Sequence, residues 1–290
     1  MSVTSLPINP DAGGRPLRPT AARVLDCLTE GNEHHGADRE LAGNLKRVAP
    51  WLPSSVMVNR RHATRVVRYL AGAAGYRQFL DLGCGLPYAN ETDQTLHTHG
   101  AALSVRNDVC TVYVDNDPGV CAHANTELAA HEGTLAVQAD VTDIDRLLTM
   151  PQVTKVLDLS HPVAVLAHDL LPWIDDDAAF DLACGLHRRL PPGSALSVTH
   201  ASTETSRSEA MLALREAYGG AGIAFRPRSR GHIRALLGQW HMETPGVVPT
   251  ELWGVGYGRY AQTIPSGPDT FSGTYAAITT NPTARSSRQE

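Results

Sequence analysis

The sequence predicts an α/β protein with a seven-stranded, mostly parallel sheet, helices on both faces and an N-terminal helical extension. From about residue 76 onward, short apolar segments alternate with helical segments, which is the pattern of consecutive β-α units. Acidic residues and histidines directly follow several of the apolar segments. Because open parallel sheets bind ligands at the carboxyl ends of their strands, we expect a ligand site there.

Both ends of the chain, residues 1–19 and 281–290, are expected to be disordered tails because they contain few apolar side chains. Residues 20–75 are expected to form a helical cap. Within it, the polar segment 29–36 separates two helical stretches and is either a lid over a site or a plain interhelical loop. A helix is expected over 54–74, and the sheet domain over 76–280.

The segment 78–87 is the centre of the prediction. Its side chains Phe79, Leu80 and Leu82 are typical of a central strand that is covered on both faces. Asp81 places a carboxylate among them, and a buried carboxylate needs solvent, a hydrogen-bond donor or a ligand. We therefore expect Asp81 to face a site.

Two glycines, Gly83 and Gly85, follow this strand, and the absence of a Cβ lets the backbone approach a ligand closely. A dinucleotide-binding turn has a third glycine three positions later, where this chain has Tyr88. The turn therefore favours a ligand without a pyrophosphate, such as S-adenosylmethionine (SAM), a nucleoside joined to a methionyl sulfonium. The alternative is an ordinary strand–turn–helix corner, with Pro87 in the first helical turn.

The next strand, expected at about 109–114, ends in Asp115, Asn116 and Asp117. An acid at the tip of this strand occupies the position that binds ribose hydroxyls in such sheets, so Asp115 is the predicted ribose ligand. Asp117 and Pro118 are expected to begin a helix. The remaining strands are expected at about 135–141, 163–167, 195–199, 240–248 and 273–279.

Composition limits the class of function. The net charge of −5 and the pI near 6.2 give no electrostatic footprint for nucleic acid or a membrane surface. The arginines between residues 226 and 234 are expected to be a solvated helix start. The five cysteines form no CxxC pair, and no apolar run is long enough to span a bilayer. These features favour a cytoplasmic protein with reduced thiols.

Side chains at the strand ends are candidate general bases. They are His168 and Asp169 after the fourth strand and His200 after the fifth, and His34 and His35 in the segment 29–36 are further candidates. A lone histidine at a strand end is more often structural than catalytic. We expect His168 to be the leading candidate.

Three other residues bear on ligands. Arg60, on the helix expected over 54–74, is a candidate partner of a ligand carboxylate because a guanidinium pairs with carboxylates through two hydrogen bonds. His97 and His99 do not share a helix face, so we expect no metal site and place both at the surface.

Several segments together resemble an actinobacterial family of SAM-dependent methyltransferases, once catalogued as a domain of unknown function, with a Rossmann-like class I fold. The pair FLDLGCGLP (79–87) and YVDNDP (113–118) is the specific part of the resemblance. The other matching segments are 22–26, 36–40, 58–60, 68–70, 77–78, 138–140, 190–194 and 226–229. The resemblance runs from about residue 20 to residue 280.

The resemblance implies SAM as the cofactor. The implied cofactor-binding residues are Arg60, Asp81, Gly83, Cys84, Gly85, Asp115, Asn116, Asp140 and Val141. In such folds Asp81 orients the amino group, Asp115 holds the ribose hydroxyls, Asp140 with Val141 borders the adenine, and the glycine turn passes the methionyl part.

The chain departs from the family pattern where the acceptor pocket is expected. Cys27 replaces a common aromatic residue, and the segment 30–35 replaces a Gly-Gly-Lys-Asp-Asn-like lid. The segment 171–173 reads Leu-Pro-Trp in place of a Leu-His-Phe-like sequence. We therefore expect a small-molecule methyl acceptor, methylated on oxygen or nitrogen, that is unusual for the family.

Other functions stay open at this point. Amino-methylating DNA enzymes carry an Asn/Asp-Pro-Pro-aromatic motif after the fourth strand, where this chain has the sequence His-Asp-Leu-Leu (168–171), so we expect no nucleic-acid substrate. A SAM-binding protein without methyl transfer, or SAM chemistry other than methylation, is the alternative. A role in specialised metabolism rests on family analogy, and a homodimer is left open.

Overall fold

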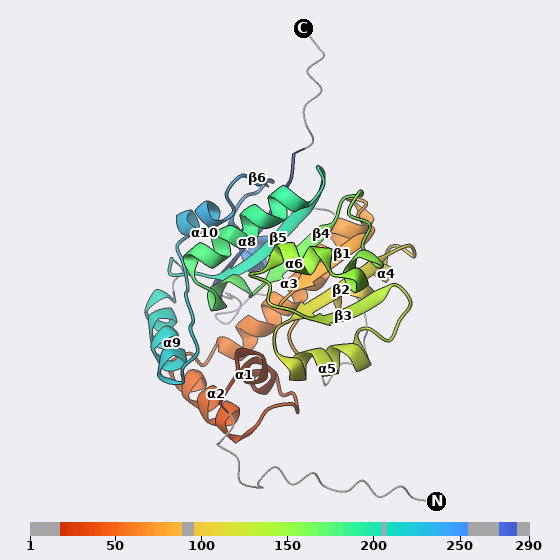
Figure 1. The fold of residues 1–290 in the computed structure, drawn as a ribbon. Coiled ribbons are helices and arrows are strands. Elements are labelled where there is room, and N and C mark those ends of the chain that lie inside the picture. Colours follow the sequence, from red (N-terminus) through yellow and green to blue (C-terminus); the bar gives the residue numbers. More distant parts are fainter. Residues whose placement is uncertain (1–17, 89–95, 205–206, 255–272, 283–290) are drawn as a thin grey trace, which may run out of the picture.

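The computed structural model describes residues 18–88, 96–204, 207–254 and 273–282. One mixed sheet crosses the molecule with the strand order β3-β2-β1-β4-β5-β8-β6 (Figure 1). Its parallel strands are β1 (Gln78–Leu82), β2 (Cys110–Asp115), β3 (Thr134–Gln138), β4 (Ala164–His168) and β5 (Ala195–Ala201). The final strand β8 (Thr274–Thr280) runs antiparallel to β5, so the predicted mixed α/β class with a mostly parallel sheet is confirmed.

The expected single strand over 240–248 is wrong. Two short strands, β6 (His241–Met242) and β7 (Val248–Pro249), both pair with β8. A turn separates them, in which the amide of Gly246 donates to the carbonyl of Glu243. Pro245 lies inside this turn and has no N–H with which to continue a ladder, so one strand becomes two.

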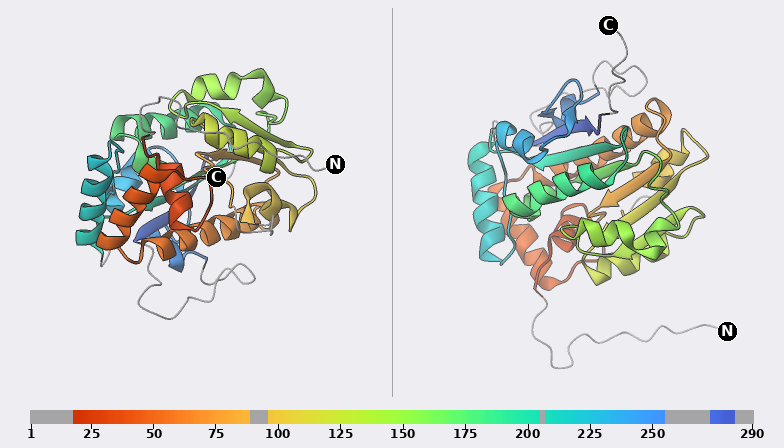
Figure 2. Two further views of the ribbon diagram at one scale, coloured as in Figure 1. Left: turned by 90° about the horizontal axis from the view of Figure 1, so that it is seen from below. Right: turned by 45° about the horizontal axis from the view of Figure 1, so that its top comes forward.

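Helices cover both faces of the sheet (Figure 2). One face packs against α6 (Ile144–Thr149), α8 (Asp176–Arg189) and α10 (Arg230–Leu236). The other face packs against α3 (Leu52–Gly72), α4 (Thr98–Leu103) and α5 (Pro118–Glu127). Leu80 and Leu82 belong to the first core and Phe79 to the second, as the two-residue period of a strand requires.

The N-terminal helices α1 (Ala21–Leu28) and α2 (Gly36–Val48) pack with α9 (Ser208–Gly220) in a separate hydrophobic cluster (Figure 1). The helix α3 joins this cluster to the sheet. Its first residue Leu52 lies in the cluster, whereas Val66 and Leu70 lie in the core against the sheet. The helices α1 and α2 thus pack in the cluster with α9, whereas most of α3 packs against the sheet.

The segment 29–36, which could have been a lid, is organised around Asp26. The buried Asp26 carboxylate accepts hydrogen bonds from the Glu33 amide (2.9 Å) and shares one with His34 Nδ1 (3.0 Å). A Cβ at Gly31 would overlap this carboxylate. A glycine and a buried acid thus hold the connection in one shape.

Two expectations, one on a connection and one on a chain end, change. Pro87 opens no helix, because α4 begins at Thr98, and residues 89–95 lie outside the described part. Asn281 is not in a tail: it is buried and donates to the carbonyls of His187 and Leu190 (both 3.0 Å). The rest of the predicted tails, 1–17 and 283–290, lie outside the described residues. No described helix is long and apolar enough to cross a membrane.

Candidate functional site

The glycine turn after β1 is held against the neighbouring strand β2. The amides of Gly83 and Cys84 both donate to the carbonyl of Val114, at 2.8 and 3.0 Å. Gly83 and Gly85 each have a φ of +67°, a conformation that side chains with a Cβ adopt at a cost. The sequence therefore needs glycine at both positions.

The two glycines differ in what surrounds them. A Cβ at Gly85 would meet nothing within 4 Å, so this residue presents bare backbone to open space. A Cβ at Gly83 would lie 2.8 Å from Leu170 Cδ1. Gly85 fits the expected approach of a ligand, whereas Gly83 makes room for the segment that follows β4.

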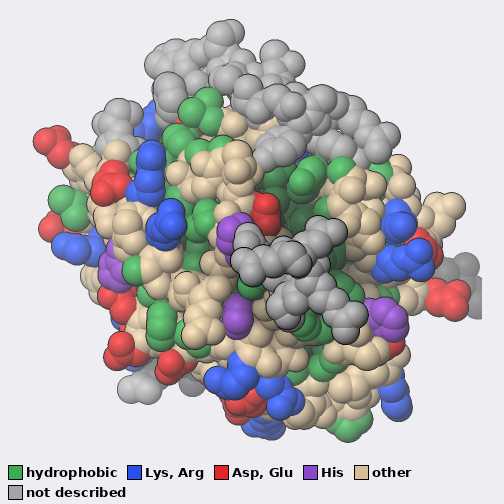
Figure 3. Space-filling model, turned by 90° about the horizontal axis from the view of Figure 1, so that it is seen from above, with side chains coloured by type: hydrophobic (Ala, Val, Ile, Leu, Met, Phe, Trp, Pro, Cys, Tyr) green, Lys and Arg blue, Asp and Glu red, His purple; other side chains and the backbone are tan. Residues whose placement is uncertain are grey.

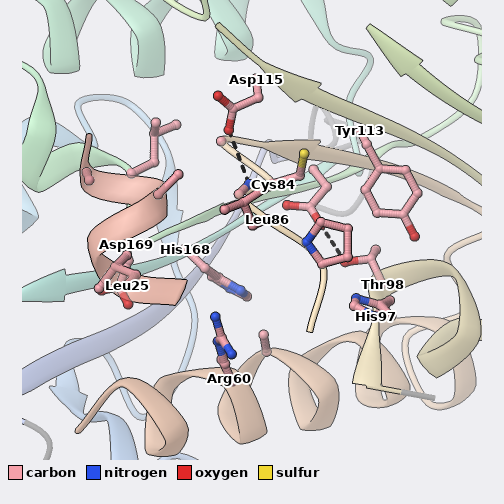
Figure 4. Close-up of a pocket in the computed structure, with 18 of the residues that line it drawn as sticks. Leu25, Arg60, Cys84, Leu86, His97, Thr98, Tyr113, Asp115, His168 and Asp169 are labelled. Carbon is pink, nitrogen blue, oxygen red and sulfur yellow. Dashed lines mark hydrogen bonds between the residues drawn. The ribbon is translucent and has the colours of Figure 1, made fainter. Parts of the chain in front are cut away.

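One cavity of about 370 Å³ lies beside the turn (Figure 4). It is lined by all of the predicted cofactor-binding residues: Arg60, Asp81, Gly83, Cys84, Gly85, Asp115, Asn116, Asp140 and Val141. It is also lined by two of the predicted catalytic residues, His168 and Asp169. His200 is not among the lining residues.

Asp115, at the tip of β2, is held by backbone amides. Its carboxylate accepts hydrogen bonds from the amides of Gly85 (3.1 Å) and Asp117 (3.0 Å), as Figure 4 shows for Gly85. Burial raises the pKa of Asp115, and the amide donors oppose that effect. These bonds fix the carboxylate next to the glycine turn.

Asp81 lies in the adjacent strand β1. Thr98 Oγ1, at the start of α4, donates to Asp81 Oδ2 at 2.6 Å. Burial raises the pKa of Asp81 to about 6, and the negative charge of Asp115 adds to the effect. The two carboxylates are thus close enough to interact: β1 and β2 are adjacent parallel strands, and Asp81 is paired with Tyr113, two residues before Asp115. Nothing in the sequence pattern had singled out Thr98.

Two predictions for the histidines near α4 are wrong. His97 lines the cavity and stacks on Tyr88 with a ring separation of 4.7 Å, while the Arg60 guanidinium lies 4.1 Å from the same ring. Burial lowers the pKa of His97 to about 4. His99 is buried, and its amide donates to the Tyr113 hydroxyl. The described residues contain no group of three possible metal ligands.

His168 is the last residue of β4 and Asp169 follows it, and both line the cavity (Figure 4). His168 Nε2 lies 2.9 Å from the Ser197 hydroxyl, and burial lowers the pKa of His168 to about 4. Asp169 accepts from Asn59 Nδ2 at 2.8 Å, and its amide donates to the Thr199 hydroxyl at 2.9 Å. Burial raises the pKa of Asp169 to about 6.

His200, the remaining predicted candidate base, is buried and does not line the cavity. Side chains alternate along β5, so His200 faces away from Ser197 and Thr199, which contact the end of β4. Its Nδ1 bonds the carbonyl of Ala201, and its Nε2 lies 2.8 Å from the Arg228 guanidinium. Burial lowers its pKa to about 3, which keeps it neutral beside the arginine.

Arg228 was expected in solvent and is buried instead. It donates to the carbonyls of Leu171 and Ile174 and to the carboxylate of Asp176, each at 2.8 Å. These contacts hold the 3-10 turn η2 (Leu171–Trp173) that follows β4. The sequence did not predict this burial, because no local pattern distinguishes one buried arginine from the solvated arginines beside it.

The turn η2 brings Trp173 to the cavity. Behind it the Trp173 ring packs on Tyr218 (5.2 Å between centroids) and Phe225 (5.0 Å). Leu25 of α1 and Ile174 continue this side of the cavity. The glycine-turn side is thus rich in carboxylates, and the opposite side is largely apolar. His34 and His35 do not line the cavity, and the departures at 30–35 lie away from it.

The chain is similar to a known protein family and to solved structures. The sequence model of a family described as S-adenosyl methyltransferase matches residues 15–279. A crystal structure of a candidate methyltransferase from Thermobifida fusca is 34% identical, with a TM-score of 0.80, over 92% of this chain and 96% of that one. A DUF574 family protein from Streptomyces avermitilis is 27% identical, with a TM-score of 0.79, over 91% of this chain and 98% of that one.

No curated protein matches the chain significantly. The family match nevertheless covers most of the chain, including β1, β2 and the glycine turn between them. The fold agrees with it, since the sheet order and the helices on both faces are those of Rossmann-like class I methyltransferases. The chain therefore belongs to the S-adenosyl methyltransferase family and is a SAM-dependent methyltransferase with SAM as its cofactor.

Proposed function

We propose that the protein transfers the methyl group of SAM to an oxygen or nitrogen atom of a small molecule. The supporting observation is the extent of the cavity, which continues from the glycine turn past the end of β4 to Leu25, Val56 and Trp173. Its volume of about 370 Å³ lies in the range of small-molecule sites. The apolar side chains Leu25, Val56 and Trp173 give an acceptor a surface away from the carboxylates of the glycine-turn side, with Asp169 as the carboxylate at the end of β4.

The residues around the turn fit SAM. Gly85 leaves open space where a side chain would project, and Asp115 is fixed at the tip of β2, where ribose hydroxyls are bound in such sheets. Asp81 would hold the amino group, Asp140 with Val141 would border the adenine, and Arg60 would pair with the methionyl carboxylate. When bound, SAM supplies an activated methyl group, so positioning by the protein provides much of the rate.

The acceptor also has to lose a proton, and Asp169 suits this task better than the expected His168. The pKa of His168 is lowered to about 4, so its imidazole is neutral but a weak base at pH 7. The pKa of Asp169 is raised to about 6, which brings the carboxylate closer to the working pH of a general base. His168 then orients the end of β4 through Ser197.

A nucleic-acid substrate has less support. In the face shown in Figure 3, Lys and Arg side chains lie in small groups beside acidic side chains. The net charge of −5 also disfavours a polyanion. A cytoplasmic location, a homodimer and a role in specialised metabolism remain predictions.

The proposal can be tested with purified protein, SAM and a cell extract divided by size. We expect S-adenosylhomocysteine to form with the low-molecular-weight fraction, and mass spectrometry to show one product heavier by a methylene group. Asp115→Asn should abolish the signal by weakening SAM binding. Transfer only to the protein or nucleic-acid fraction would contradict the proposal.

A further inference from the structure

Asp169 has an unusual setting for a carboxylate. It has a φ of +52°, a backbone conformation that is rare outside glycine, and it lines the cavity. Its polar neighbours are the neutral side chains Asn59 and Thr199. Among the described residues no cation within salt-bridge distance pairs with it, and the charge of Arg60 comes last among the effects that lower its pKa, after the hydrogen bonds of Asn59 and Thr199.

The other carboxylates of the cavity have evident roles. Asp115 is held by two backbone amides, Asp117 caps α5 through the amide of Gly119, and Asp140 accepts hydrogen bonds from the amide and the hydroxyl of Thr142. Asp81 would bind the one ammonium group of SAM. Asp169 is therefore left as a buried carboxylate on the acceptor side with no ion pair among the described residues, and such a buried charge is costly unless a ligand supplies a cation.

A chain of hydrogen bonds fixes how Asp169 is presented. The Thr274 hydroxyl donates to Asn59 Oδ1 at 2.7 Å, so the Asn59 amide must turn its NH₂ group toward Asp169 Oδ2. Because the Thr274 proton is used in this bond, the Thr250 hydroxyl donates to Thr274 Oγ1, also at 2.7 Å. Thr250 of η3 (Thr250–Leu252) and Thr274 of β8 thus fix the orientation of the Asn59 amide on α3. Asn59 in turn presents its NH₂ group to Asp169.

We propose that the methyl acceptor is an amine, whose ammonium group is bound by Asp169 and whose apolar body lies against Leu25, Val56 and Trp173. This inference rests on the proposed function and names its substrate class. Asp169 takes a proton from the ammonium group, and the freed nitrogen lone pair forms the N–C bond. The S–C bond breaks with its electron pair staying on sulfur. Asn59 is a positioning residue for Asp169.

The test measures binding and needs no turnover. The protein is loaded with S-adenosylhomocysteine, and calorimetry at pH 7.5 compares two probes of the same shape, 2-phenylethylammonium and 2-phenylethanol. We expect the ammonium probe to bind about tenfold more tightly, and Asp169→Asn to remove this preference. The exposed Asp108, which pairs with Arg77 away from the cavity, provides the control Asp108→Asn, which should keep the preference.

The positioning role of Asn59 has its own readout. Ammonium binding should strengthen as pH rises through the pKa of Asp169, near 6. The Asn59 hydrogen bond lowers that pKa, so Asn59→Leu should move the midpoint to higher pH, and Thr274→Val should move it in the same direction by less. An unchanged midpoint in Asn59→Leu would contradict this role.

Three results would overturn the amine inference: equal affinities for the two probes, a preference that survives Asp169→Asn, or no measurable binding of the ammonium probe. Each leaves the proposed function standing if the extract still yields a methylated hydroxyl compound. Failure of the proposed function gives a different result: in that case neither an amine nor a hydroxyl compound of the small-molecule fraction is methylated. Unchanged affinity of Asp169→Asn for S-adenosylhomocysteine shows that the cofactor side is intact.

Discussion

Replacing Arg228 tests whether the segment after β4 is held by one buried guanidinium. Arg228→Met keeps much of the side-chain volume and removes all of its hydrogen bonds. His200 Nε2 and the carbonyls of Leu171 and Ile174 lose their donor. A buried polar group left unpaired costs about 1–3 kcal/mol. The bond to Asp176 adds little, because that carboxylate is 55% exposed.

Together these losses predict a decrease in the free energy of unfolding of about 3–5 kcal/mol, as for other broken buried charge networks. Urea unfolding followed by circular dichroism measures it. The neighbouring Arg234 is exposed, so Arg234→Met should change the free energy by less than about 0.5 kcal/mol. Arg228→Lys should recover only part of the loss, because an ammonium cannot reproduce the planar set of donors. A change below about 1 kcal/mol in Arg228→Met would refute the reasoning.

Three further predictions concern the cavity. Gly85→Ala and Gly75→Ala both place a Cβ at a positive φ with no atom within 4 Å, so each should lower the free energy of unfolding by about 1–2 kcal/mol. Only Gly85→Ala should also weaken SAM binding, measured by calorimetry. Asp115→Ala should weaken SAM binding at least about tenfold with little change in secondary structure, and equal affinity would remove its ribose role. The pKa values of Asp81 and Asp169 are near 6 in the folded state, compared with about 3.8 in the unfolded chain. Between these two values the folded state binds more protons than the unfolded state, so the free energy of unfolding should fall as the pH rises from about 4 to 6. Asp169→Asn should therefore raise the melting temperature at pH 7, and a decrease would contradict the buried-charge argument.

The site that the sequence predicted came from local patterns. The apolar strands, the glycines at positions needing a positive φ and the acids Asp81 and Asp115 at strand ends all lie within short segments. Parallel pairing then brings those ends together, because neighbouring strands of one direction must finish at the same side of the sheet. The half of the cavity beside the glycine turn therefore followed from the chain alone.

Only the tertiary structure decided the arrangement around the end of β4. Asn59 and Thr274 are separated by 215 positions, and Arg228 reaches Leu171 across 57. No local period marks such pairs, since each residue is an ordinary polar side chain until packing excludes water around it. His200 and His168 looked alike as histidines at strand ends, but the side-chain alternation of β5 turned one away from the cavity. The sequence by itself determined the strands and the carboxylates at their ends, while packing decided which polar groups are buried and which partners they have.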